Sequence, residues 1–260
     1  MLITVILTFI FYPLVMRFLR AAGVTKPNWR RIYVVNSFGI LLPVVMLTAA
    51  AIYSLQFMSQ TQLAFTDSNF LALVILVVGS SFAGFIDDLL GSRAIGGIRG
   101  HFSQLKYGIM TSGTLKAVLG LALAIIVANL YSPNILFLLL NSAVITLSMN
   151  TANLFDLRPG RALKFFALAV LAVFAVSYKD PFWQLWVFIL PPVVALLWGD
   201  LREESMLGDA GANSLGAILG LTFVVNLHWL TNLVILILLV GLHLFTEKYS
   251  LTETIARVPV

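Results

Sequence analysis

The chain has 260 residues, of which 60% are hydrophobic and only 10% are charged, and its mean hydropathy is +0.99. Soluble domains carry roughly 25% charged residues, so this composition excludes a soluble globular enzyme, a disordered chain and a nucleic-acid binder of the usual basic kind. Cysteine is absent, which excludes disulfides, thiol chemistry and cysteine metal sites. An integral membrane protein with several spans remains.

The hydrophobic residues form nine stretches that approach the roughly 20 residues needed to span a bilayer. They predict an all-α bundle of about nine transmembrane helices that forms a single domain over residues 1–260. The first stretch is expected to be a retained span, because its basic residues follow the apolar run instead of preceding it. In chain order the predicted spans cover residues 1–16, 34–56, 69–86, 114–131, 134–152, 163–178, 182–198, 213–229 and 231–246.

The distribution of charge predicts an orientation, because Lys and Arg in short loops favour the cytoplasmic side. With the N-terminus outside and nine alternating spans, 15 of the 16 basic residues fall inside and only Lys179 falls outside. Nine of the 11 acidic residues fall inside as well. We therefore predict a multi-pass plasma-membrane protein with an outside N-terminus, a cytoplasmic C-terminus and its chemistry at the cytoplasmic face.

Two adjacent acids, Asp87 and Asp88, stand where the third predicted span leaves the membrane. Adjacent helical residues point about 100° apart, so one carboxylate can bind a metal while its neighbour faces another group. Acids at this depth are expensive unless a cation or a basic partner offsets their charge. A solvated helix end explains the pair about equally well.

A second polar group ends the fifth predicted span. If the helix continues to Asp156, then Asn150, Asn153 and Asp156 form one polar strip, because steps of three residues return to nearly the same face. Arg158 and Arg161 flank the Pro-Gly turn that follows. Amides and a carboxylate beside two arginines suit a phosphate-bearing ligand, whereas helix capping with membrane anchoring is the alternative.

A third group is the small-residue segment 207–216 at the start of the eighth predicted span, which contains Asp209. Small residues let the backbone approach a ligand closely. Asp209 is either a helix N-cap or a metal ligand, in which case amides at the helix start would face phosphate oxygens.

Lys116 begins the fourth predicted span, and it lies near the Asp pair if the third and fourth spans are neighbours. A lipid phosphate would need such a cation, although simple anchoring at the cytoplasmic surface explains Lys116 equally well. The histidines His101, His228 and His243 show no spacing typical of metal ligands, and none is predicted to be catalytic.

Acids, amides and basic groups on one membrane face fit magnesium-assisted chemistry on a phosphate. Mg²⁺ takes oxygen ligands, usually one or two carboxylates together with substrate phosphates. It also neutralises the charge that develops during phosphoryl transfer. We therefore predict a Mg²⁺-dependent enzyme at the membrane surface.

At these motifs the sequence resembles the polyprenyl-phosphate N-acetylhexosamine-1-phosphate transferases of glycosyltransferase family 4, which include phospho-N-acetylmuramoyl-pentapeptide transferase. The resemblance covers about residues 1–250 and is carried by Phe85-Ile86-Asp87-Asp88, by Asn150-x-x-Asn153-Leu154-x-Asp156 and by Gly208-Asp209-x-Gly211, in the order of the family. Lys116 resembles the lysine with which the family opens the next span.

The resemblance implies transfer of a sugar-1-phosphate from a UDP-sugar to a polyprenyl phosphate, with release of UMP, in cell-envelope glycan synthesis such as that of peptidoglycan. It implies that the protein works in a membrane and has no nucleic-acid partner. A homodimer is compatible with the resemblance. Read residue by residue, it implies Mg²⁺ binding by Asn153 and Asp209, catalytic roles for Asp87 and Asp88, and substrate binding by Lys116, Asn150 and Asp156.

The sequence departs from the family pattern in two places. The family usually continues the second motif with Gly-x-Asp-Gly, whereas this chain has Leu157-Arg158-Pro159-Gly160, so Arg158 and Arg161 become the candidate pyrophosphate contacts. The late cytoplasmic loop and the tenth span of the family are expected to be absent. These departures keep open a non-catalytic homologue that binds lipid-linked precursors or scaffolds an envelope-synthesis complex. A transporter is disfavoured, because no ionisable residue lies near the middle of a predicted span.

Overall fold

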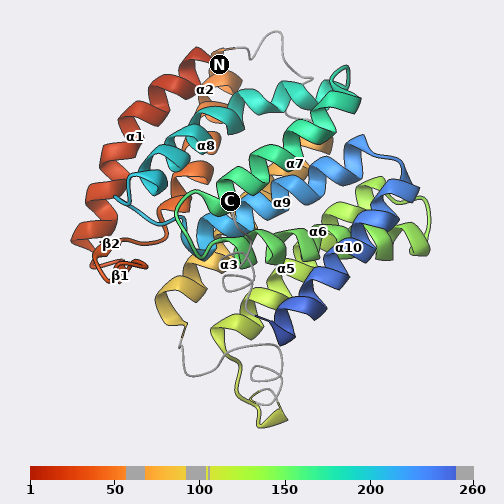
Figure 1. Cartoon of the computed structure of the whole chain (residues 1–260). Coiled ribbons are helices and arrows are strands. Elements are labelled where there is room, and N and C mark those ends of the chain that lie inside the picture. The colour runs from red at the N-terminus through yellow and green to blue at the C-terminus, as the bar shows by residue number, and fades with distance from the viewer. Residues whose placement is uncertain (57–67, 92–103, 105, 250–260) are drawn as a thin grey trace, which may run out of the picture.

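The computed structural model describes residues 1–56, 68–91, 104 and 106–249, and in these residues the chain is a bundle of α-helices (Figure 1). Three short 3-10 helices, η1 (Phe38–Ile40), η2 (Asn129–Tyr131) and η3 (Pro181–Leu185), extend some of the α-helices at their ends. The α-helices are α1 (Leu2–Ala21), α2 (Leu41–Gln56), α3 (Ser68–Leu90), α5 (Ser112–Ala128), α6 (Ile135–Phe155), α7 (Arg161–Ser177), α8 (Trp186–Leu201), α9 (Gly208–Asn226) and α10 (Trp229–Lys248).

Each of the nine predicted spans overlaps one of these helices, so the prediction of an all-α, multi-pass membrane bundle is confirmed. Within the described ranges, eight helices are long and apolar enough to cross a membrane. The exception is α7, whose 17 residues rise only about 26 Å at 1.5 Å per residue. Helices α2, α5 and α8 are no longer than α7 by themselves, but η1, η2 and η3 lengthen them enough to cross a membrane. The orientation of the bundle in the membrane stays a prediction.

Helix α9 occupies the middle of the bundle and packs against α3, α6 and α7 (Figure 1). In its most apolar window 89% of the residues are buried, compared with 11% for α10 at the periphery. Small residues allow this close approach: a Cβ atom on Gly216 would lie 2.3 Å from the backbone oxygen of Ser148 on α6. Close backbone contact through glycine is a common way to join helices in lipid, where the hydrophobic effect between helices is missing.

The remaining helices form two groups around α9. Helices α1, α2 and α8 pack against one another, while α3, α5, α6 and α10 each contact the next in a row. The row α3–α5–α6–α10 and the central α9 surround the polar residues discussed below. The core that joins both groups is almost entirely aliphatic and aromatic.

A small β-hairpin follows α1 and was not predicted from the sequence. Strands β1 (Thr25–Pro27) and β2 (Tyr33–Val35) pair antiparallel. The turn between them is held by the side chain of Asn28, whose Oδ1 accepts hydrogen bonds from the backbone of Arg30 and Ile32, a common role of Asn in turns. Strands of three residues are too short for an alternating hydrophobic pattern, so they could not be predicted from periodicity.

Candidate functional site

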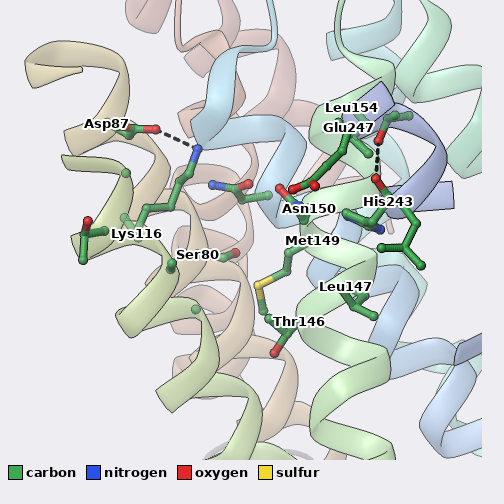
Figure 2. Close-up of a pocket in the computed structure, with 18 of the residues that line it drawn as sticks. Ser80, Asp87, Lys116, Thr146, Leu147, Met149, Asn150, Leu154, His243 and Glu247 are labelled. Carbon is green, nitrogen blue, oxygen red and sulfur yellow. Dashed lines mark hydrogen bonds and ion pairs between the residues drawn. The ribbon is translucent and has the colours of Figure 1, made fainter. Parts of the chain in front are cut away.

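The site lies at one end of the bundle, where a cavity of about 1480 Å³ opens between α3, α5, α6, α9 and α10 (Figure 2). Its lining divides by chemistry into a polar group and an apolar wall. Asp87, Lys116, Asn150 and Asn213 contribute carboxylate, ammonium and amide groups, and Ala83, Ala117, Gly120, Leu147 and Met149 are among the apolar and small residues beside them.

The shortest ion pairs in the site join three helices through one lysine. Lys116 Nζ lies 2.7 Å from Asp87 Oδ2 and 2.5 Å from Asp209 Oδ2. Figure 2 shows Lys116 reaching from α5 toward Asp87 on α3. The three side chains are largely buried, with 16% to 25% of each exposed. Two carboxylates from α3 and α9 therefore share a single ammonium group.

Helix ends place these three side chains. Asp87 lies in the last turn of α3, Lys116 in the first two turns of α5 and Asp209 in the first turn of α9. Thr111 caps α5 by accepting a hydrogen bond from the backbone of Thr114. A Cβ atom on Gly84 would lie 2.3 Å from the backbone oxygen of Asp209, so a glycine there lets α3 and α9 approach.

Asp209 is not the N-cap of α9, which is Leu207, and Leu207 makes no side-chain cap hydrogen bond. The capping interpretation of Asp209 is therefore wrong, and its carboxylate pairs with Lys116 instead. The amide group of Ala210 at the helix start donates to Asp88 Oδ2 over 3.3 Å. In this structure the backbone amide of Ala210 therefore binds the carboxylate of Asp88. The sequence had suggested that amides at this helix start would face a phosphate.

Asp88 faces a different set of partners from Asp87. Its Oδ2 also accepts a hydrogen bond from the Ser37 hydroxyl at 2.7 Å, and its Oδ1 lies 3.4 Å from Lys26 Nζ of β1. The side chain is 6% exposed. Gly208 has φ of +68°, and a Cβ atom there would lie 2.5 Å from Asp88 Oδ2. Asp88 therefore ties the hairpin to the start of α9.

The polar segment after α6 is anchored by its own backbone and by α8. Asp156 follows the last residue of α6, and Arg161 Nε donates to the backbone oxygen of Phe155 at 2.9 Å. The buried carboxylate of Asp200 accepts a hydrogen bond from the backbone of Gly160, whose φ is +71°. Asp200 thus fixes the turn that leads from Asp156 into α7.

Burial raises the pKa of Asp156 well above its usual range, and the negative charges of Asp200, Asp209 and Asp88 raise it further. The guanidinium of Arg161 opposes this increase. The charges of Asp209 and Asp88 therefore act on Asp156 although it lies on a different element. A cation bound near these acids would favour the ionised form of Asp156.

The hairpin is connected to the loops beside the site. Glu203 accepts a hydrogen bond from Asn28 at 3.0 Å and pairs with Arg30 at 3.3 Å. The guanidinium of Arg158 lies 4.6 Å from the centre of the Trp29 ring. Arg158 thus stacks on the hairpin, and the structure places no described residue of the cavity cluster in an ion pair with it.

The structure brings together only part of the predicted site. Asp87, Lys116 and Asp209 form one cluster, which confirms that the helices carrying Asp87 and Lys116 are neighbours, and Asn150 lines the same cavity. The side chain of Asn153 makes no hydrogen bond with any residue in the described ranges. Arg93, Arg99, Arg257 and Glu253, which the sequence analysis counted among the charged residues inside, lie outside the described residues, as does His101.

Several residues of the site were missed from the sequence. Ser37 and Lys26 contact Asp88, and Asp200 holds the backbone of Gly160. These contacts arise only through the fold, and no motif marked the three residues. His243 and Glu247 line the cavity from α10, and their spacing of four residues on one helical face was a signal that went unused. Figure 2 shows both side chains on the α10 side of the cavity, near Asn150.

The donor set is compatible with Mg²⁺ only if a substrate completes it. Among the residues that the structure describes, no group of three or more His, Asp or Glu side chains could hold a metal ion. Two carboxylates, Asp87 and Asp209, nevertheless converge on one positive charge. One or two carboxylates plus substrate phosphates are a usual Mg²⁺ environment, so these two residues fit the ion.

Comparison with known proteins adds no relative from which a function could be transferred. No family model matches the chain, and no curated protein matches it.

Proposed function

We propose that the protein is a Mg²⁺-dependent phosphosugar transferase of the membrane. It transfers a sugar-1-phosphate of the N-acetylhexosamine type from a UDP-sugar to a polyprenyl phosphate at the cytoplasmic face. The observation that carries the proposal is the cluster of Asp87, Lys116 and Asp209 at the polar part of a large cavity. The motif resemblance points to the same reaction.

The shape and chemistry of the cavity support an amphiphilic acceptor. Its apolar wall includes Leu147 and Met149 of α6, and its polar part includes Asn150 one residue further on. A polyprenyl chain needs apolar surface, whereas its phosphate needs donors and cations. A transporter would be expected to carry ionisable groups deep in the membrane, whereas these charged groups lie at helix ends.

In the proposed reaction an oxygen of the lipid phosphate forms a bond to the phosphorus that carries the sugar. The bond from this phosphorus to the UMP oxygen breaks, so the products are UMP and a lipid pyrophosphate sugar. Asp87 takes up the proton of the acceptor phosphate or positions this phosphate, and Lys116 contributes positive charge beside it. Asp209 would hold Mg²⁺, which supplies neutralisation of the charge that develops on the phosphates.

The test is a transfer assay with purified protein, undecaprenyl phosphate and a set of radiolabelled UDP-N-acetylhexosamines. We expect a lipid-linked product that forms with Mg²⁺ and disappears with a chelator. Asp209→Asn is expected to lower the rate by about 10²-fold or more, because it removes a charged ligand from a site that stabilises developing charge.

Glu204→Gln provides a matched control at the same end of the bundle. Glu204 is a half-exposed carboxylate that pairs with Arg202 outside the cavity, so its loss should leave the rate within about twofold. Absence of a lipid-linked product with every donor, or equal rates in Asp209→Asn and the wild type, would contradict the proposal. Binding of lipid-linked precursors without turnover and without dependence on Mg²⁺ would instead favour a non-catalytic binding protein.

A further inference from the structure

The position of the Lys116 ammonium is unusual for a residue that is expected to bind substrate. It lies between two carboxylates from different helices, at 2.7 Å from Asp87 Oδ2 and 2.5 Å from Asp209 Oδ2. Its side chain is 22% exposed, so the charge is largely withdrawn from water. Lys116 therefore neutralises the two oxygens that would otherwise be available to a metal ion.

Two carboxylates held together and away from water repel each other unless a cation lies between them. Helices α3 and α9 pack closely at this point, because Gly84 brings the backbone of α3 against that of Asp209. The fold thus fixes the two acids near each other whether or not a metal is present. A cation or a shared proton relieves this repulsion, and in this structure the ammonium of Lys116 contacts both carboxylates.

Lysine is suited to leave such a position. Its ammonium is a compact charge on a flexible four-carbon stem, and it is a common ligand for phosphate. The cavity that adjoins Lys116 is lined by the amide side chains of Asn150 and Asn213, so a phosphate there would meet further hydrogen-bonding groups. A phosphate in the cavity therefore offers Lys116 an alternative partner.

We infer that Lys116 and a divalent metal ion compete for Asp87 and Asp209, and that a phosphate ligand favours the metal by taking over Lys116. This inference rests on the proposed function, because it assumes that Asp209 is a metal ligand and that Asp87 acts on the acceptor phosphate from beside the same ion. Its consequence is an ordered dependence: the metal binds weakly to the free protein and more tightly once a phosphate is present. By reciprocity, the metal raises phosphate affinity by the same factor.

The first experiment measures Mn²⁺ binding to the detergent-solubilised full chain by electron paramagnetic resonance, with and without UMP. In the wild type we expect UMP to tighten Mn²⁺ binding by about tenfold or more, within the range of typical coupling between sites. In Lys116→Met, Mn²⁺ should bind about tenfold more tightly than to the wild type when UMP is absent. The further gain from UMP should shrink, because only direct contact between UMP and the metal remains.

Lys248→Met is the matched control. Lys248 lines the same cavity, but no ion pair joins it to Asp87 or Asp209 within the described residues. Its loss removes the same charge without freeing the two carboxylates, so Mn²⁺ affinity should change less than about threefold. If both variants bind Mn²⁺ more tightly by the same factor, the effect is one of general electrostatics. The inference that Lys116 competes with the metal would then be wrong.

A second measurement does not depend on whether Lys116→Met folds. An amine-reactive probe is applied to the wild type, and modification of each lysine is measured by mass spectrometry with and without Mn²⁺. Release of Lys116 from its two carboxylates should raise its modification several-fold when Mn²⁺ is added, whereas Lys26, which pairs with Asp88, should not change. Unchanged or reduced modification of Lys116 would contradict the inference.

The outcomes separate this inference from the proposed function. If Mn²⁺ binds and Asp209→Asn removes it, but Lys116 reactivity does not respond, the metal uses other oxygens and only the competition is wrong. If Mn²⁺ does not bind even with UMP, the metal role of Asp209 fails, and the competition fails with it. The transfer assay then decides separately whether the protein still forms a lipid-linked product.

Discussion

Asp87 and Asp88 are adjacent on α3, yet they serve two different regions of the molecule. Asp87 faces the cavity and pairs with Lys116, which it shares with Asp209. Asp88 faces the hairpin and the start of α9, where Ser37, Lys26 and the amide of Ala210 surround its carboxylate. The rotation of about 100° between neighbouring helical residues accounts for this division.

The difference shows that two identical neighbouring residues can have separate roles, one in the reaction and the other in holding the fold together. The carboxylate of Asp88 binds the Ser37 hydroxyl, the backbone amide of Ala210 and Lys26, so it stabilises the junction of three segments. Asp87 borders open cavity and holds a flexible lysine. We therefore expect Asp87 to matter for turnover and Asp88 to matter for stability.

The largest expected effect is on turnover. Asp87→Asn should lower the transfer rate by about 10²-fold or more, because it removes the proposed proton acceptor or positioning group for the acceptor phosphate. Its thermal stability in detergent should change little, since Asp209 remains as a partner for Lys116. A rate close to that of the wild type would show that Asp87 is not needed for the reaction. The proposed difference in role between Asp87 and Asp88 would then be wrong.

The next effect is on stability. Asp88→Ala should lower the free energy of unfolding by about 3 kcal/mol, because it leaves Ser37 and Lys26 without their acceptor and uncaps α9. Thermal unfolding in detergent measures this loss, and Glu204→Gln again serves as a control. If Asp88→Ala unfolds like the wild type but loses turnover, Asp88 belongs to the chemistry and the division is wrong.

Gly208→Ala tests the same junction at the residue beside Asp88. It should lower the free energy of unfolding by about 2 kcal/mol. The added Cβ would lie 2.5 Å from Asp88 Oδ2 and 2.7 Å from the backbone nitrogen of Ser37, at a φ of +68°. Gly23→Ala is a matched control, because φ is +72° there and nothing lies within 4 Å of the added atom. Gly23→Ala should show the backbone strain alone, about 1 kcal/mol.

The smallest effect concerns pH and Asp156. Because the folded protein raises the pKa of this carboxyl group, the folded state binds a proton more tightly than the unfolded state does. Its contribution to stability is therefore present at low pH and is lost as pH rises through the raised pKa. Asp156→Asn should be more stable than the wild type at neutral pH, by on the order of 1 kcal/mol, and the gain should fade near pH 4.

Thermal unfolding of Asp156→Asn at a series of pH values measures this dependence. A gain that is equal at pH 4 and pH 7 would show that the change acts through packing and not through charge. A transfer rate that falls while stability rises would sharpen the comparison, because it would place Asp156 with Asp87 among residues kept for function at the expense of stability.

Much of the fold could be predicted because it depends on patterns that are local along the chain. Long apolar stretches have few alternatives to membrane helices, since backbone polar groups must be satisfied within lipid. Helix ends were predicted less well: α9 begins at Gly208, five residues before the predicted span, so Asp209 lies within the helix. The hairpin was missed, because short strands leave no periodic pattern.

The residues of the candidate site could be predicted from the sequence, but the contacts that each of them makes could not. The sequence by itself determined that Asp87, Lys116 and Asp209 lie at helix ends on one face of the bundle, because apolar spans force charged residues to their ends. Only the tertiary structure decided that Lys116 joins Asp87 to Asp209, that Asp88 binds the hairpin and that Asp200 holds the turn at Gly160. These contacts depend on which helices pack together. Packing in lipid depends on close contacts at small residues such as Gly84 and Gly216, and a hydropathy pattern does not specify those contacts.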